Sequence, residues 1–224
     1  MLIRRRIDGR RWHELSWRRI NFWRGEMRGY LKHFLAVALV VAAPLAKAEP
    51  PPPTVNEFNI LFGSQRYNLI DRTTFLPWNI TGITVMFSVP VPITSGSVNS
   101  LSGVSAAGFS GLGTSTLSWT FPALSDGPHS FVLAGTGANA LKDSYDIPLY
   151  GGADFTKTFS VLFGDFNGDG KVNRADVDGV DAARTQPYSI FADIDGNGVV
   201  DINDVDLIRA TVSRTTARSK RAVK

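Results

Sequence analysis

The sequence predicts a mainly β fold in which a β-sandwich is followed by a small α-helical module. Five segments rich in Val, Ile, Phe and Thr, separated by clusters of Gly, Ser, Pro, Asn and Asp, fill residues 54–162. None of them shows a sustained period of 3.6 residues, so strands are favoured over helices. Beyond them, DFNGDGKVNRADVD at 165–178 recurs as DIDGNGVVDINDVD at 193–206. This repeat predicts a second, duplicated module.

Residues 1–48 have the organisation of a secretory signal. A basic stretch is followed by the apolar run 34–43 and by Ala46-Lys47-Ala48, which fits a small-residue cleavage site. The run is too short to cross a bilayer, so we expect no transmembrane span in the mature chain. We predict a true translation start at Met27 and a proline-rich spacer at 49–53 after cleavage. The mature protein is expected to be secreted, to the extracellular space or the surface of a bacterial cell.

Residues 54–162 are predicted to form one immunoglobulin-like β-sandwich. The strand segments are NEFNILF, ITGITVMFSVPV, STLSWTF, HSFVLAG and TKTFSVLF. Alternating apolar residues such as Ile83, Val85 and Phe87 give a strand one buried face. Many short strands with turn signals between them are typical of such a sandwich. Residues 92–116, rich in Ser and Gly, are expected to form a long connection and a slack edge.

Two pieces of this domain, ITGITVMFSVPV and LSWTFPALSDGPHSFVLAGTGANALKDSYDIPL, resemble bacterial Ig-like domains that are repeated in secreted proteins. His129 and Phe131 stand near positions where that family often has Tyr. We expect the domain to act as a spacer or an adhesive domain.

An enzymatic function is not predicted. The acidic residues of 54–162 fall mostly in predicted turns, where Asp is a common turn former, and glycoside hydrolysis needs two facing carboxylates. These acids are Glu57, Asp71, Asp126, Asp143, Asp146 and Asp154. His129 follows Gly-Pro and is expected in a turn or on the surface. No G-x-S-x-G or H-E-x-x-H motif occurs. A small hydrolase with unrecognised residues is the hypothesis that a glycosidase screen would test.

Exposed aromatic rings would support another function, the binding of glycans. Trp78, Tyr67, Tyr145 and Tyr150 are available for stacking on sugar rings. The favoured interpretation is that Trp119 belongs to the core and that Trp78 packs beside Pro77. The alternative function is therefore that of an accessory carbohydrate-binding protein of extracellular polysaccharide degradation.

The repeated segments match the spacing of a twelve-residue calcium loop. Such a loop offers oxygen ligands at positions 1, 3, 5, 7, 9 and 12, with glycine at position 6. In the first copy the ligands are Asp165, Asn167, Asp169, the carbonyl of Lys171, Asn173 and Asp176. In the second copy they are Asp193, Asp195, Asn197, the carbonyl of Val199, Asp201 and Asp204. Gly170 and Gly198 occupy position 6, so both copies are complete, and we predict two bound Ca²⁺ ions.

The duplication extends beyond the ligands. Each loop is followed by a short helix with an apolar stripe, Val177-Val180 in one copy and Val205-Ile208-Val212 in the other. Asp stands at position 12, where an ordinary EF-hand has Glu, and a strand rather than a helix precedes the first loop. In these features residues 163–214 are similar to the type I dockerin domain.

This resemblance implies a module that folds on binding two calcium ions and docks onto a cohesin domain, tethering secreted proteins, often polysaccharide-degrading enzymes, to a scaffold. Loop positions 10 and 11 are Arg174-Ala175 and Ile202-Asn203, whereas cellulosomal dockerins often have Ser-Thr. The expected partner is therefore a cohesin-like domain other than a cellulosomal one. Because the sandwich has its own core, we expect its thermal transition to be independent of the loops.

Charge and composition restrict the partners further. The net charge of +4 arises from basic ends, since residues 49–208 carry 7 basic and 17 acidic side chains. A nucleic-acid partner is not expected for so acidic a body, because phosphate recognition needs a basic surface. The chain has no cysteine, which excludes disulfides and thiolate metal sites. The basic tail 215–224 is predicted to be disordered.

Overall fold

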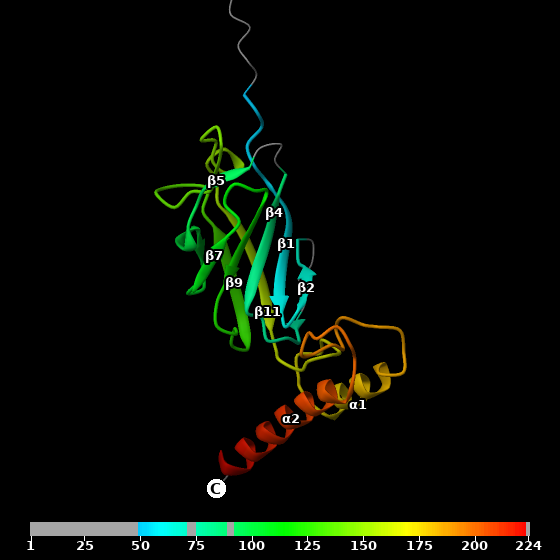
Figure 1. Cartoon of the computed structure of the whole chain (residues 1–224). Coiled ribbons are helices and arrows are strands. Elements are labelled where there is room, and N and C mark those ends of the chain that lie inside the picture. Colours follow the sequence, from blue (N-terminus) through cyan, green and yellow to red (C-terminus); the bar gives the residue numbers. More distant parts are fainter. Residues whose placement is uncertain (1–48, 71–74, 89–91, 223–224) are drawn as a thin grey trace, which may run out of the picture. The chain divides into compact units, whose positions relative to one another are not determined.

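The computed structural model describes residues 49–70, 75–88 and 92–222, and the predicted signal sequence with its start at Met27 lies outside them. The described residues form a mainly β protein with two α-helices, which confirms the predicted class (Figure 1). No described helix is long and apolar enough to cross a membrane. The described residues all belong to one unit that begins at Glu49.

The larger sheet has five antiparallel strands. Its order is β2 (Gln65–Asn68), β1 (Val55–Phe62), β4 (Gly82–Phe87), β8 (Thr116–Thr120) and β7 (Gly108–Ser110). β1 and β2 form a hairpin whose turn is Gly63-Ser64, because Phe62 pairs with Gln65. Gly63 has a φ of +51°, in the left-handed region that favours glycine. This turn contacts the second Asp-rich loop.

The second sheet has four strands. Their order is β3 (Phe75–Leu76), β11 (Phe155–Val161), β9 (Gly127–Leu133) and β6 (Leu101–Ser102). β3 runs parallel to β11, and the other pairs are antiparallel. A two-stranded ribbon joins β10 (Lys142–Asp143) to β5 (Ile93–Ser95), and the 3₁₀ helices are η1 (Val98–Ser100) and η2 (Leu149–Gly151).

The prediction that residues 92–116 form a long connection is wrong. Three short strands, β5, β6 and β7, lie in this segment, and each belongs to a different sheet. β6 and β7 are edge strands, so the expected edge is present. These strands are two or three residues long, which is too short for an alternating pattern to be visible in the sequence.

The two larger sheets share one hydrophobic core. Ile83 and Val85 on β4 and Trp119 on β8 alternate with less buried residues and are fully buried. From the second sheet, the ring of Phe131 approaches that of Phe58 on β1, with 6.5 Å between the ring centroids. Burial of these alternating apolar faces holds the sheets together. Trp119 is thus a core residue, as predicted.

Two helices enclose a smaller second core. α1 (Arg174–Ala183) and α2 (Ile202–Ala222) follow the two Asp-rich loops. The predicted apolar stripes are buried there, with Val177, Val180, Val205 and Ile208 in one cluster. α2 continues to Ala222, so the prediction of a disordered tail from residue 215 is wrong for most of its length. No Gly or Pro follows Ile202, and Ala, Arg and Lys are good helix formers, so nothing in the sequence ends the helix earlier.

Candidate metal centre

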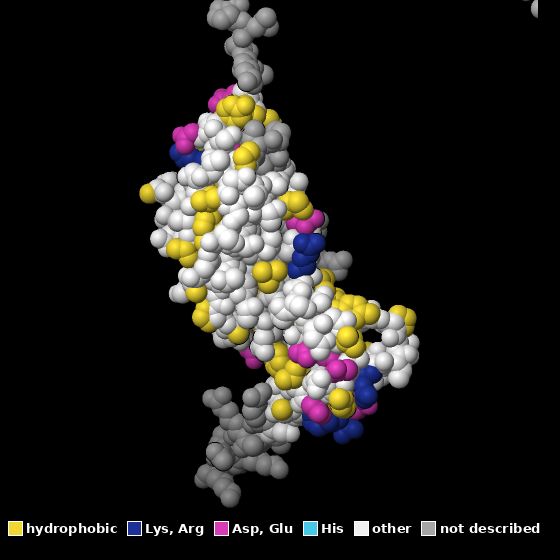
Figure 2. Space-filling view, in the orientation of Figure 1, with side chains coloured by type: hydrophobic (Ala, Val, Ile, Leu, Met, Phe, Trp, Pro, Cys, Tyr) yellow, Lys and Arg dark blue, Asp and Glu magenta, His cyan; other side chains and the backbone are white. Residues whose placement is uncertain are grey.

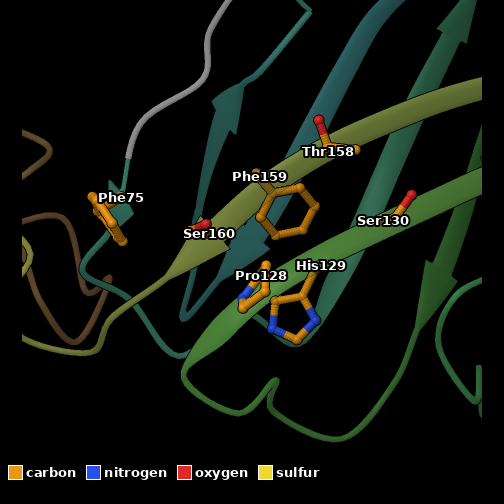
Figure 3. A pocket seen from close by; sticks show the side chains of 7 residues that line it. All are labelled: Phe75, Pro128, His129, Ser130, Thr158, Phe159 and Ser160. Atoms are coloured by element: carbon orange, nitrogen blue, oxygen red, sulfur yellow. The ribbon is translucent and has the colours of Figure 1, made fainter.

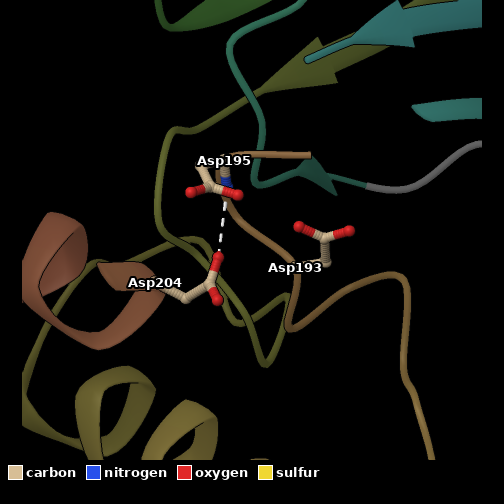
Figure 4. A group of neighbouring side chains, drawn as sticks. All are labelled: Asp193, Asp195 and Asp204. Atoms are coloured by element: carbon tan, nitrogen blue, oxygen red, sulfur yellow. Dashed lines mark hydrogen bonds between the residues drawn. The ribbon is translucent and has the colours of Figure 1, made fainter. Parts of the chain in front are cut away.

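The second Asp-rich loop brings three carboxylates together. One carboxylate oxygen each from Asp193, Asp195 and Asp204 lies within 4.8 Å of the other two (Figure 4). Asp193 and Asp195 come from the loop, whereas Asp204 lies in the first turn of α2. Asp193 and Asp204 are fully buried. Within the described residues, this is the one group of three acidic or histidine side chains that meets at this distance.

The first loop has a different set of charges. Asp165 and Asp176, at positions 1 and 12, are buried, but position 3 is Asn167 and contributes an amide in place of a carboxylate. Asn173, at position 9, is the N-cap of α1 and accepts a hydrogen bond from the amide of Ala175 at 2.8 Å. Asp176 accepts in turn from the Asn173 amide at 2.8 Å. Positions 9 and 12 of the predicted calcium loop therefore form a capping box.

Seven hydrogen bonds recur in both loops at the offset of 28 residues. The position-1 carboxylate accepts from the amides of positions 5 and 6, at 3.1 and 2.9 Å in the first loop and 3.0 and 2.9 Å in the second. The position-12 carboxylate accepts from the amides of positions 3 and 9, at 3.2 and 2.8 Å in both loops. The side chains at positions 3, 5 and 9 each accept from the amide two residues later. The two copies therefore share one loop conformation.

Burial raises the pKa of carboxyl groups in both loops. For Asp165, burial is the main cause of the raised pKa, and the charge of Asp176 adds to it, while three backbone N–H donors lower it. For Asp195, burial is again the main cause, and the charges of Asp204 and Asp193 add to it. Each loop thus concentrates negative charge in a place where water compensates it poorly.

No cationic side chain of the described residues forms an ion pair with these carboxylates. The ion pairs found in this part of the chain are Lys142–Asp146, Arg174–Asp178, Arg184–Asp181 and Arg209–Asp206. All four join neighbours three or four residues apart and lie outside the ligand positions. A buried carboxylate normally has a partner charge, so a bound cation would complete both loops.

The donor set fits calcium. Positions 1, 3, 5, 9 and 12 offer carboxylate and amide oxygens, which are the ligands of a hard cation. At position 7, where the backbone carbonyl is the expected ligand, the side chains of Lys171 and Val199 are exposed, that of Val199 by 57%. All twelve predicted ligands therefore lie in two equivalent loops. Among the described residues, only the second loop brings three carboxylate oxygens within 4.8 Å of one another.

Tyr188 belongs to the second loop's surroundings, and the sequence analysis missed it. Its hydroxyl donates a hydrogen bond to Oδ2 of Asp193 at 2.8 Å. Burial, this bond and the charges of Asp193 and Asp204 raise the pKa of Tyr188 to about 12. At the offset of 28 residues the first copy has Ser160, on β11, so the repeat gives no signal for a tyrosine here.

The second loop is joined to the β-sheet by hydrogen bonds. The carbonyl of Gly196 accepts from the amide of Ser64 at 2.7 Å and from its hydroxyl at 2.9 Å. Trp78 donates from Nε1 to the carbonyl of Ile190 at 3.2 Å. Ile190 precedes Asp193 and Gly196 follows it, so these bonds attach the second loop to the β-sheet on both sides of Asp193.

An aromatic cluster completes this attachment. The ring of Phe191 stacks on Trp78 with 5.1 Å between centroids and meets Tyr67 edge-on at 5.3 Å. Trp78 also stacks on Phe62 at 4.1 Å. Ile190 and Phe191 pack against the core of the β-sheets. Residues of the second copy therefore contribute to the core of the β-sheets, whereas the expected independence of the thermal transition stays a prediction.

The predicted sugar-stacking residues are mostly engaged in packing. Trp78 is fully buried, and Tyr67 packs against it. The hydroxyl of Tyr150 accepts from the amide of Val55 at 3.1 Å, and its ring is stacked with that of Phe155. Tyr145 is 52% exposed. Tyr145 is therefore the member of the predicted set with the most accessible ring.

A shallow hollow of about 420 Å³ lies over β3, β9 and β11 (Figure 3). It is lined by Phe75, Pro128, His129, Ser130, Thr158, Phe159 and Ser160. His129 lies on β9 rather than in a turn, and its Nε2 is 2.8 Å from the carbonyl oxygen of Ser125. None of the described residues that line the hollow is a carboxylate, so they do not include the paired acids of a glycoside hydrolase.

Charged side chains are unevenly distributed on the face shown in Figure 2. Few lie over the β-sheets, whereas acidic and basic side chains gather around the two helices.

Comparison of the chain with protein-family models, curated proteins and solved structures finds no match. The candidate metal centre is therefore supported by the residues of this chain alone.

Proposed function

We propose that this chain is a secreted, non-catalytic calcium-binding protein. In this proposal, residues 163–214 are a dockerin-like module for calcium-dependent protein attachment, and residues 54–162 are an immunoglobulin-like β-sandwich that acts as a spacer or adhesive domain. The observation that carries the proposal is the recurrence of seven hydrogen bonds in two loops whose side chains are the ligands of a twelve-residue calcium loop.

Each loop would hold one calcium ion. Asp165 and Asp176 in the first loop, and Asp193 and Asp204 in the second, are buried carboxylates with fixed hydrogen bonds. The asparagine and remaining aspartate side chains at positions 3, 5 and 9 and the carbonyls at position 7 complete the oxygen set. When bound, the ion offsets the negative charge that burial leaves uncompensated in the loops.

A protein partner is supported by exposed side chains within the loops. Ile202 and Val199 are large apolar side chains exposed by 45% and 57%. Arg174, at the position equivalent to Ile202, has a side chain exposed by 84%. The two copies therefore present different chemistry at position 10, so a partner that docks on one copy would not dock equally on the other. A cohesin-like domain is the proposed partner.

Calorimetric titration with calcium tests the proposal. Wild-type protein should bind two ions, Asp165→Ala and Asp193→Ala should each lose one site, and Asn173→Ala should only weaken its site, since position 9 often acts through water. In chelator, circular dichroism should show loss of the helical signal of α1 and α2, because their small core cannot hold them. Equal helicity with and without chelator, together with no heat of binding, would falsify the proposal.

Attachment has its own test. The protein should be retained on an immobilised cohesin-like domain in calcium and released by chelator. Retention that survives chelator would contradict calcium-dependent docking. A broad glycosidase screen should give no activity, and any turnover would contradict the non-catalytic assignment.

The hollow over β3, β9 and β11 favours a second candidate, carbohydrate binding. Its described lining combines the ring of Phe75, exposed by 42%, with hydroxyls of Ser130, Thr158 and Ser160 and contains no carboxylate. Such a lining suits a neutral polyhydroxylated chain. A pull-down on insoluble polysaccharides compares wild type with Phe75→Ala and with Tyr145→Ala, which lies outside the hollow. Retention lost only in Phe75→Ala would support this candidate, and no retention of wild type would remove it.

A further inference from the structure

We propose that the β1–β2 turn is part of the second calcium site, with Gly63 and Ser64 as positioning residues for its loop. The inference rests on the proposed calcium binding and adds residues that lie outside the repeated motif. Its consequence is that the two sites are unequal: the second binds calcium more tightly than the first, and its occupation stabilises the β-sheets.

The contact is made at position 4 of the second loop. The Gly196 carbonyl accepts two hydrogen bonds from Ser64, at 2.7 Å from the amide and 2.9 Å from the hydroxyl. Gly196 directly follows Asp195, one of the three clustered carboxylates. Fixing this carbonyl restricts the backbone that carries the ligand at position 3, before any ion is bound.

Two glycines allow the turn and the loop to approach this closely. A Cβ on Gly63 would lie 2.3 Å from the carbonyl oxygen of Asp195, and a Cβ on Gly196 would lie 2.4 Å from that of Phe62. Both glycines have left-handed φ values, +51° and +71°. A side chain at either position would therefore separate the two backbones. The sequence motif requires neither glycine for ligand chemistry.

The first loop lacks this contact. Gly168 is its position-4 residue and has a φ of +74°, close to that of Gly196. A Cβ on Gly168 would meet nothing within 4 Å among the described residues. The nearest equivalent contact lies at position 6, where a Cβ on Gly170 would be 3.9 Å from the Phe75 ring. The same loop conformation is thus braced at position 4 in one copy and open to solvent in the other.

Bracing in advance lowers the cost of ordering the loop when calcium binds. Two hydrogen bonds to one carbonyl correspond to roughly a tenfold to thirtyfold difference in affinity. Linkage requires the reverse effect as well: calcium at the second site must strengthen the contact with the turn.

The paired variants Gly196→Ala and Gly168→Ala, made in the full chain, test the proposal. Both place alanine at a φ near +70°, so the backbone strain is matched, but only Gly196→Ala meets Phe62. Calcium titration followed by the amide resonances of Gly170 and Gly198 gives the affinity of each site separately. We expect Gly196→Ala to weaken the second site about tenfold more than Gly168→Ala weakens the first. Equal losses would overturn the proposal.

A milder variant avoids the steric conflict. Ser64→Ala removes only the hydroxyl bond and should weaken the second site by about threefold while leaving the first unchanged, and Ser64→Thr, which keeps a hydroxyl, should restore it. Amide exchange of Ser64 should be slower in calcium than in chelator. Unchanged exchange would overturn the positioning role even if both sites bind calcium. Absence of binding at both sites in wild type would instead refute the proposed function.

Discussion

Truncation of Phe191 should destabilise the β-sheets, although this residue belongs to the second copy of the calcium repeat. Its ring contacts Trp78 at 5.1 Å and Tyr67 at 5.3 Å between centroids, and it packs against the core shared by the two large sheets. Phe191→Ala removes both ring contacts. The fixed partner, Trp78, is fully buried and cannot shift easily to fill the space.

The size of the effect follows from these contacts. Phe191 is half-buried, so about 100 Å² of apolar surface is lost, and at about 25 cal/mol per Å² this is about 2.5 kcal/mol. The aromatic contacts add about 1 kcal/mol. A loss of about 3 to 4 kcal/mol in the free energy of unfolding corresponds to a fall in Tm of roughly 10 °C for a unit of this size. Phe191→Leu, which keeps apolar volume, should lose about 1 kcal/mol.

Scanning calorimetry with near-ultraviolet circular dichroism gives the measurement, because the aromatic signal reports the packing of Trp78. Phe163→Ala is the matched control, since Phe163 holds the same position in the first copy but packs against the helical core. This control should lower the helical transition and leave the aromatic transition in place. If Phe191→Ala leaves the aromatic transition unchanged, the second copy is not part of the β-sheet core and the reasoning fails.

Two further predictions concern the charges of the second loop. Burial raises the pKa of Asp195, so its contribution to the folded metal-free loop is present at acid pH and is lost as the pH rises through this pKa. Asp195→Asn should therefore increase the helical circular dichroism signal in chelator at pH 7 while weakening calcium binding, and a helical signal that does not increase would contradict this. The Tyr188 pKa of about 12 should decrease in calcium, because the ion offsets the charge of Asp193, and ultraviolet titration against Tyr188→Phe measures it. The raised pKa also means that metal-free stability declines between about pH 10 and 12. An unchanged Tyr188 titration in calcium would show that no cation lies near Asp193.

The shared conformation of the two Asp-rich loops was predictable because the pattern is local. Twelve consecutive residues hold all the ligands of one loop, and glycine at position 6 has a left-handed φ in both copies. The helix starts follow from the same residues, since Asn173 caps α1 and Asp176 completes its capping box. The apolar stripes of α1 and α2 repeat with the helical period and are buried as expected.

Contacts between distant segments were not predictable in this way. Ser64 and Gly196 are 132 residues apart, and neither carries a periodic or compositional signal. Phe191 is the counterpart of Phe163 at the offset of 28 residues, yet Phe163 packs against the helical core and Phe191 against the core of the β-sheets. Strands of two or three residues, such as β6, are likewise fixed by their partners rather than by their own composition.

The two copies therefore share the conformation of the loop, whereas the contacts of each loop with the rest of the protein differ. Two loops with matching hydrogen bonds would bind calcium equally if the loop were the whole site. Yet Gly196 rests on Ser64, whereas its counterpart Gly168 has no neighbour within 4 Å among the described residues. In the proposed function the ligand set selects the ion, and the contact with the β1–β2 turn is what distinguishes the second loop from the first. If both loops bind calcium as proposed, the sites should fill in order, with the braced loop first, so that the sheets are stabilised before the first loop is complete.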